Sequence, residues 1–165
     1  NRQYGTNFIS VMPTNLYGKK DNFDLETSHV IPALLRKFHE AKIQNALNVK
    51  VWGTGNPMRE FLYVEDMVDA CIFLFEGVDA KEICSQGISH VNIGTGEDLT
   101  IHDLAMKIKR TVGYQGDIVF ESSKPDGTPR KLLDVTRLNS MGWESKVTFE
   151  QGIQETYNWY IRNAQ

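Results

Sequence analysis

The spacing of hydrophobic and polar residues divides the chain into short strands and longer helices. Short apolar or alternating runs are typical of strands in a buried sheet. Such runs predict strands at residues 7–12, 49–53, 60–64, 91–93 and 117–122. Apolar residues three or four positions apart are typical of the inner face of a helix. That spacing predicts helices at residues 28–44, 64–78, 100–112, 134–142 and 148–164.

Polar residues before three of these segments are suited to cap helix N-termini. Ser28 precedes the first helix as a predicted N-cap, and Pro32 lies in its first turn, where proline is tolerated. Thr100 is followed three positions later by Asp103, which approximates a capping box, and Thr148 precedes the last helix. Because strands alternate with helices along the chain, the sequence predicts an α/β fold.

Composition narrows the class of protein. The chain has 165 residues, a net charge of −3 and 41% hydrophobic residues, which suits one globular domain. The slight acidic balance argues against binding to nucleic acid. No apolar run is long enough to span a membrane, and no signal peptide is recognisable, so we expect a cytoplasmic protein. Two cysteines, Cys71 and Cys84, do not form a disulfide framework, and Cys71 is expected in the core.

Two Gly-Thr-Gly turns, at residues 53–55 and 94–96, follow predicted strands. Neither continues to the third glycine of a dinucleotide-binding motif, because Met58 and Leu99 stand at that position. No triphosphate-binding loop is present either. The plain interpretation is a tight turn after each strand.

Arg59 makes the first of these turns a candidate anion site. A guanidinium at the start of a strand can meet phosphate oxygens with two parallel hydrogen bonds. The alternative is a surface ion pair with Glu60 or a nearby acid. Trp52 could stack on a base or sugar, although a strand tryptophan more often lies in the core. The basic loop at residues 124–134 could close over an anion, or could be a solvated surface loop.

His29 is a candidate general acid or base. The reference pKa of histidine, about 6.5, allows proton transfer near neutral pH. The alternative is a polar residue in the first turn of a helix. His39, His90 and His102 have no evident partner, and no motif has the spacing of metal ligands, so no metal site is predicted.

Three segments together resemble the GDP-L-fucose synthases, a family of the extended short-chain dehydrogenase/reductase superfamily. They read "SVMPTNLYGKKDNFDLETSHVIPALLRKFHEA", "VWGTGNPMREFLYVEDM" and "KPDGTPRKLLDVTRLNSMGW". The pattern R-E-F-x-Y-V-x-D is shared by many nucleotide-sugar epimerases, whereas the other segments are more specific to this family. The resemblance covers nearly the whole chain.

The resemblance implies an NADPH-dependent enzyme that acts on GDP-4-keto-6-deoxy-D-mannose. Such an enzyme inverts C3 and C5 and then reduces the C4 ketone to give GDP-L-fucose. His29 matches the acid/base histidine of epimerisation and lies beside the cofactor. The other implied contacts are Pro13, Asn15 and Leu16 for the cofactor, and Asn15, Lys37, Trp52, Arg59 and Lys131 for the substrate. Lys37 stands where related sequences often have arginine, so its role is less specific.

Residues 1–165 lack two motifs that the resemblance leads one to expect. No tyrosine is followed four positions later by lysine, and no glycine-rich dinucleotide motif occurs. We therefore expect a fragment: a single C-terminal substrate-binding domain, with one or two strands of a missing Rossmann domain, inactive alone. The full enzyme is expected to form a homodimer. Alternatives are part of another nucleotide-sugar epimerase or dehydratase, or a non-catalytic nucleotide-sugar binding module.

Overall fold

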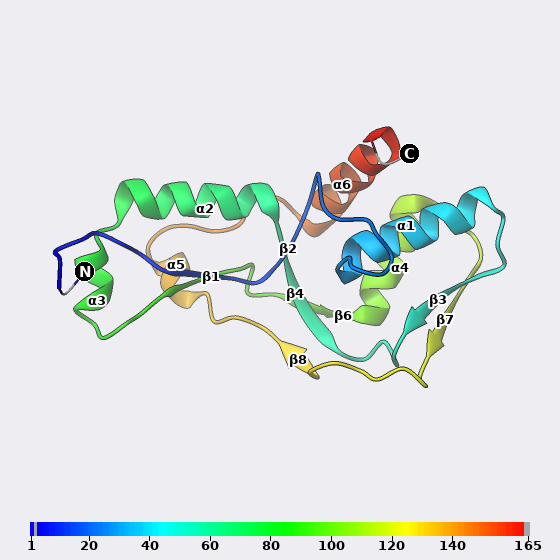
Figure 1. The fold of residues 1–165 in the computed structure, drawn as a ribbon, viewed down its shortest axis with the longest axis horizontal. Coiled ribbons are helices and arrows are strands. Elements are labelled where there is room, and N and C mark those ends of the chain that lie inside the picture. Colours follow the sequence, from blue (N-terminus) through cyan, green and yellow to red (C-terminus); the bar gives the residue numbers. More distant parts are fainter. Residues whose placement is uncertain (2, 164–165) are drawn as a thin grey trace.

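The computed structural model describes residue 1 and residues 3–163, arranged as short strands and helices (Figure 1). The strands are β1 (Val11–Pro13), β2 (Asn15–Tyr17), β3 (Asn48–Trp52), β4 (Met58–Tyr63), β5 (Val91–Ile93), β6 (Asp98–Thr100), β7 (Asp117–Glu121) and β8 (Arg130–Lys131). The helices are α1 (Val30–Ile43), α2 (Val64–Gly77), α3 (Ala80–Cys84), α4 (Ile101–Val112), α5 (Thr136–Ser140) and α6 (Phe149–Asn163). The predicted α/β class is confirmed.

The strands form small sheets that are mostly parallel. β1 pairs with β5, β3 pairs with β7, and β2 pairs with β4, all in parallel. The first residues of β4, Met58 and Arg59, lie between two further strands: β6 pairs antiparallel with them on one edge, and β8 pairs parallel on the other. β4 therefore has three partner strands, and it lies in the middle of the elongated molecule (Figure 1).

Two hydrophobic cores meet at β4. Successive side chains of a strand point to opposite faces. Phe61 and Tyr63 accordingly enter the core formed with α1, α4 and α6, whereas Leu62 enters the core formed with α2, β5 and α5. α1 buries Ile31, Leu34, Leu35 and Phe38 in the first core. The two cores thereby fix the orientation of β4, and with it the directions of Met58, Arg59 and Glu60 at its start.

Most predicted elements are present, with three corrections. The strand expected at residues 7–12 is β1, which covers Val11–Pro13, because β5 offers only three residues for pairing. The first helix begins one residue later than predicted: His29 is its N-cap, without a side-chain capping bond, and Ser28 is not the cap. The loop at residues 124–134 contains the two-residue strand β8.

The other predicted caps are confirmed. The Thr100 hydroxyl accepts the N–H of Asp103 at 2.9 Å, and the Thr148 hydroxyl accepts that of Gln151 at 3.3 Å. α6 ends at Asn163, and the predicted last residue of that helix, Ala164, lies outside the described residues. Cys71 is half-buried beside the second core rather than inside it, because its helix leaves one face exposed.

None of the described helices is long and apolar enough to cross a lipid bilayer.

Candidate functional site

Two hollows lie on either side of the start of α1, and Val30 borders both. The first, here the Trp52 pocket, measures about 270 Å³ and is bordered by Lys37, Trp52 and Arg59. The second, here the His29 pocket, measures about 720 Å³. Its lining includes Pro13, Asn15, Leu16 and His29. Seven of the eight predicted site residues therefore border two adjoining pockets, and Lys131 borders neither.

Trp52 lies at the end of β3 with 65% of its surface exposed, so the alternative of a core tryptophan is wrong. Two ammonium groups flank its indole. Nζ of Lys37 lies 5.5 Å and Nζ of Lys124 lies 5.4 Å from the ring centroid. Lys37 Nζ also donates to the carbonyl of Lys50 at 3.5 Å. An exposed indole with two ammonium groups close to its ring suits a planar ligand that carries negative charge.

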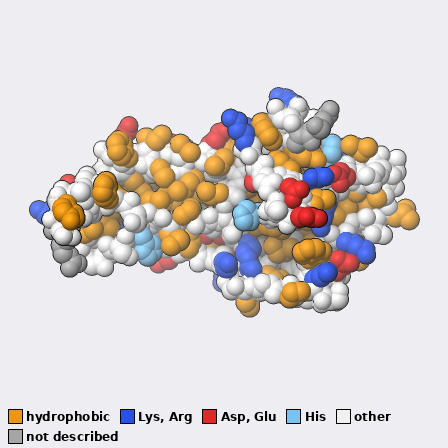
Figure 2. Space-filling model, in the orientation of Figure 1, with side chains coloured by type: hydrophobic (Ala, Val, Ile, Leu, Met, Phe, Trp, Pro, Cys, Tyr) orange, Lys and Arg blue, Asp and Glu red, His pale blue; other side chains and the backbone are white. Residues whose placement is uncertain are grey.

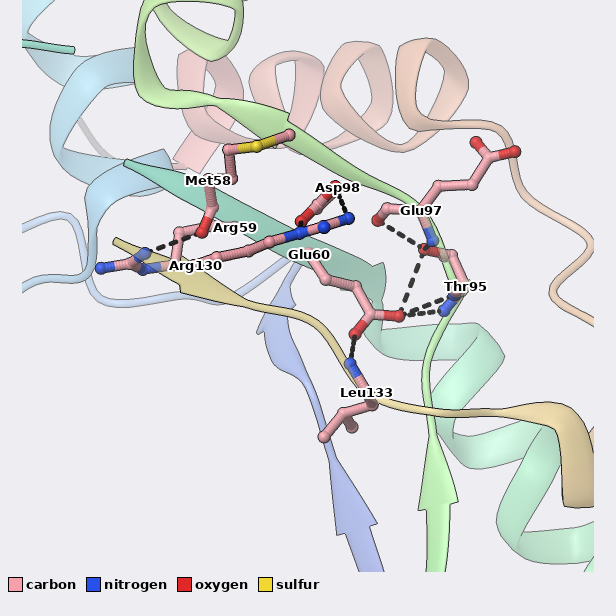
Figure 3. A network of polar contacts seen from close by, with 9 residues as sticks. Met58, Arg59, Glu60, Thr95, Glu97, Asp98, Arg130 and Leu133 are labelled. Carbon is pink, nitrogen blue, oxygen red and sulfur yellow. Dashed lines mark hydrogen bonds and ion pairs between the residues drawn. The ribbon is translucent and has the colours of Figure 1, made fainter. Parts of the chain in front are cut away.

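Arg59 does not pair with Glu60, so that alternative is wrong. Adjacent strand residues face opposite sides, and Glu60 is fully buried on the side away from Arg59. Nη1 of Arg59 donates to its neighbour's carbonyl, that of Met58, at 2.7 Å (Figure 3). No carboxylate in the described part of the chain forms an ion pair with this guanidinium. Its remaining N–H donors have no acceptor among the residues that the structure describes, so they can meet an anionic ligand.

The basic loop is held against the first Gly-Thr-Gly turn. The carboxylate of Asp126 accepts the N–H of Thr54 at 2.9 Å and its hydroxyl at 2.6 Å. These hydrogen bonds lower the pKa of Asp126. Gly53 has a φ of +81°, and a Cβ there would come within 2.3 Å of the Asp126 carboxylate, so glycine is required. This docking places Pro125, Asp126 and Gly127 on the rim of the Trp52 pocket.

Lys131 lies beside Arg59 without entering the Trp52 pocket. The two residues are opposite each other in the β4–β8 pairing. Paired residues of neighbouring strands project to the same side. Arg130 projects to the other side, where it makes a bidentate ion pair with Asp98 at 2.6 and 3.1 Å. Of the two adjacent cations, Arg130 is therefore engaged by an acid, whereas Lys131 is exposed on the side of Arg59.

The wall of the His29 pocket is anchored to β4. Asn15 Nδ2 and Thr14 Oγ1 both donate to the backbone carbonyl of Glu60, at 2.8 and 3.2 Å. His29 is exposed at the N-terminus of α1 and faces the same pocket as Asp21. Burial raises the pKa of Asp21, with smaller opposing effects from the Asn22 N–H and from His29.

The start of α1 lacks a side-chain cap. His29 provides no side-chain cap, and the buried hydroxyl of Ser28 has no hydrogen-bond partner among the described residues. The first N–H groups of a helix have no partner within the helix and carry partial positive charge. Because Val30 borders both pockets, these donors lie where the pockets adjoin.

Two structural residues of this site were not singled out from the sequence. Asp126 stands before glycine in a proline-flanked loop, which indicates only a turn. Glu60 could have been recognised because it precedes a run of apolar residues in β4 that is buried on both faces. A charged residue on an inward face is unusual and indicates a specific hydrogen-bonding role.

Comparisons with known proteins extend these observations. The chain is 56% identical to the GDP-L-fucose synthase of Escherichia coli K12, over 99% of this chain and 51% of that protein. It is 54% identical to a probable GDP-L-fucose synthase 1 of Oryza sativa subsp. japonica, over 98% of this chain and 47% of that protein. The chain thus spans about half the length of these curated relatives.

Solved structures with the same fold are also longer. A GDP-6-OMe-4-keto-L-xylo-heptose reductase from C. jejuni superimposes with a TM-score of 0.91 at 36% identity, covering 98% of this chain and 56% of that one. A GDP-L-fucose synthetase from Naegleria fowleri bound to NADP superimposes with a TM-score of 0.82 at 31% identity, covering 95% and 47%. The model of the NAD dependent epimerase/dehydratase family matches residues 1–94, more than half of the chain, and the chain therefore belongs to that family.

Proposed function

We propose that this chain is the GDP-sugar-binding part of an NADPH-dependent GDP-L-fucose synthase. The whole enzyme would convert GDP-4-dehydro-6-deoxy-D-mannose to GDP-L-fucose by 3,5-epimerisation followed by 4-reduction. The observation that carries the proposal is the placement of seven predicted site residues around two pockets that adjoin at Val30. A nucleotide sugar has two chemically different ends, and the two pockets suit them.

The Trp52 pocket suits the nucleotide end. The exposed Trp52 indole, over which Lys37 and Lys124 lie, would stack on a purine that displaces one of these flexible side chains. Arg59 and the uncapped start of α1 offer donors for the diphosphate. Lys131 adds positive charge beside Arg59. These groups give local positive charge to a chain whose net charge is −3.

The His29 pocket suits the sugar end. Epimerisation next to a ketone requires a proton to leave one face of the carbon and another to arrive on the opposite face. His29 is exposed in this pocket and can hold or deliver such a proton. Asn15, held by its bond to Glu60, would orient the sugar beside it.

NADPH would approach the same pocket. Pro13 and Leu16 give it an apolar wall and Asn15 an amide group, which fits the nicotinamide end of the cofactor. When bound, NADPH supplies the hydride for the reduction. The chain offers no glycine-rich cradle for the remainder of the cofactor. We therefore expect this chain alone to be inactive in the reduction.

Two further parts of the proposal concern the whole enzyme. We place it in the cytoplasm, which agrees with the two free cysteines Cys71 and Cys84. We also expect it to form a homodimer, as the resemblance implies.

Thermal denaturation with GDP, UDP or NADPH tests the proposal. A ligand that binds only the folded state adds about 2.7 kcal/mol at one hundred times its Kd. For a chain of this size the melting temperature should rise by roughly 5–10 °C with GDP. UDP should give a smaller rise and NADPH little change.

Variants make the thermal test specific. Arg59→Met and Lys131→Met should diminish the rise with GDP, because each removes positive charge from the diphosphate. Lys81→Met, an exposed cation on α3, is the matched control and should leave the rise unchanged. An equal rise with UDP would contradict the assignment of GDP. No rise with GDP, or a rise unaffected by Arg59→Met, would contradict the assignment of the site.

A further inference from the structure

Glu60 has a buried carboxylate that the proposed chemistry does not use. It is 0% exposed, and no ion pair involves it among the residues that the structure describes. Its oxygens instead accept three backbone N–H groups, from Thr95 at 2.7 Å, Gly96 at 2.8 Å and Leu133 at 3.1 Å (Figure 3). Burying a charge is costly unless hydrogen bonds compensate it, and these three hydrogen bonds provide that compensation.

The surroundings of Glu60 are shaped to admit its carboxylate. Gly94 lies so close that a Cβ there would come within 2.2 Å of Oε1 of Glu60. Any residue larger than glycine would displace the carboxylate. The contacts join three segments that are distant in sequence: β4, the turn at residues 94–96, and the chain after β8.

The chain around β8 contacts this carboxylate, in addition to the Arg130–Asp98 ion pair. β8 has only two residues, and so short a strand is marginal by its own pairing. The segment at residues 129–133, here the strap, is tied to β4 at both ends. At one end the carbonyl of Pro129 accepts the N–H of Met58 at 2.8 Å. At the other end the N–H of Leu133 reaches Glu60.

We propose that Glu60 is a positioning residue for the anion site: its carboxylate holds the strap against β4 so that Lys131 stays beside Arg59. Glu60 and Arg59 project from opposite sides of the strand, so Glu60 acts through the strap rather than on the ligand. The inference deepens the proposed function and rests on it, because the diphosphate of GDP is the ligand that the two cations would share.

A double-mutant cycle tests whether Glu60 and Lys131 act together. Glutamine at position 60 has one acceptor oxygen and an NH₂ group, so it cannot accept all three N–H groups. We expect Lys131→Met to weaken GDP binding by about tenfold in the wild-type chain. In the Glu60→Gln background, Lys131→Met should have less than about a twofold further effect. Calorimetric titration measures each affinity at a temperature where every variant is folded.

Asp66 supplies the matched control. Its buried carboxylate accepts the N–H groups of Lys146 and Val147 at 3.2 and 3.0 Å, away from the strap. In the Asp66→Asn background, Lys131→Met should keep its full effect. If Lys131→Met loses its effect in both backgrounds, Glu60 acts only on the overall stability of the fold, and the inference is overturned. A full effect in the Glu60→Gln background would also overturn the inference. If Glu60→Gln does not fold, Leu133→Pro removes the N–H that Glu60 accepts, besides fixing φ at that position, and should give the same result.

A measurement without ligand separates this inference from the proposed function. Trypsin should cleave after Arg130 or Lys131 faster in Glu60→Gln than in the wild-type chain or in Asp66→Asn, because the strap is released. Equal rates in all three would overturn the role of Glu60. If instead the wild-type chain binds no GDP while cleavage is accelerated as expected, the proposed function fails and the attachment of the strap by Glu60 stands.

Discussion

Among single residues, Trp52 gives the strongest indication of a ligand-binding site. A large aromatic side chain that is 65% exposed contributes little to the core, yet this one is flanked by Lys37 and Lys124 at nearly equal distances. The arrangement puts an exposed apolar ring beside two ammonium groups, neither of which forms an ion pair with an acid in the described part of the chain. A stacked nucleobase followed by a diphosphate would satisfy all three groups.

Trp52→Ala should separate binding from stability. Stacking of a base on an aromatic ring is worth about 1–3 kcal/mol, so GDP affinity should fall by roughly tenfold or more. The melting temperature without ligand should change little, because the indole is exposed. Calorimetric titration and thermal denaturation measure the two quantities. A large loss of stability with unchanged affinity would show that Trp52 is structural.

His39 should make stability depend on pH. Burial chiefly, and then Lys42, lower the pKa of His39, and Nδ1 lies 2.9 Å from the Tyr157 hydroxyl. The unfolded chain therefore binds a proton more readily, starting near its reference pKa of about 6.5. The contribution is complete above that pH and is lost as the pH falls below it.

Thermal denaturation between about pH 7 and pH 5.5 measures this effect. The melting temperature should fall over that range, and His39→Gln should lessen the fall. The exposed His90, replaced by glutamine, is the control and should leave the fall unchanged. An equal fall in wild type and His39→Gln would show that another group is responsible.

At the scale of elements, the helix N-termini differ in a way that bears on function. α4 and α6 begin with threonine caps, at Thr100 and Thr148, whereas α1 begins at His29 without a side-chain cap. α4 and α6 thus satisfy some of their first N–H groups internally. In α1 the N–H groups of Val30 and Ile31, which precede Pro32, have no side-chain cap and lie where the two pockets adjoin.

Alanine substitutions should reveal this difference. Thr148→Ala and Thr100→Ala should each cost about 1 kcal/mol of unfolding free energy, the usual value for a lost cap. Ser28→Ala should cost little, because the Ser28 hydroxyl has no partner among the described residues. Denaturation by urea gives the three values. A loss at Ser28 as large as at Thr148 would mean that Ser28 caps α1 in solution.

The sequence predicts elements best where local pattern is sufficient. The periodicity of α4 and its Thr100–Asp103 cap are local, and both predictions are confirmed. Local pattern could not predict the first residue of α1, because serine, histidine and valine can all adopt the extended conformation that precedes a helix. β8 depends on hydrogen bonds from Met58 and to Glu60, which lie about seventy residues away in the sequence. Residue types at the site were predicted, whereas the contacts that hold them required the structure.

At the scale of the whole molecule, the two ends of one face differ in how many charged side chains they carry. Figure 2 shows hydrophobic side chains gathered over the end that contains α2 and β1, while Lys, Arg, Asp and Glu gather over the other end. On α2, Val68, Ile72 and Phe75 are exposed at helical spacing, Phe75 by 88%. The pockets belong to the charged end and the region around β4. An apolar surface of this kind is typical of a face that contacts other protein.

Polar substitutions on α2 should change that face and leave the pockets intact. Phe75→Ser and Ile72→Ser should lower the fluorescence of a dye that binds apolar surfaces, because both side chains are exposed. GDP affinity should be unaffected, since neither residue borders the Trp52 pocket. Unchanged dye fluorescence would show that the face is covered in solution, for instance by a second copy of the chain.

The central claim is that the two pockets hold the two ends of one GDP-sugar. Calorimetric titration of GDP and of GDP-mannose, against the wild-type chain and His29→Ala, tests it most directly. The account predicts that His29→Ala weakens GDP-mannose by about tenfold and GDP by less than about twofold, because His29 borders only the sugar pocket. Equal weakening of both ligands, or of neither, would contradict the claim that the sugar lies beside His29.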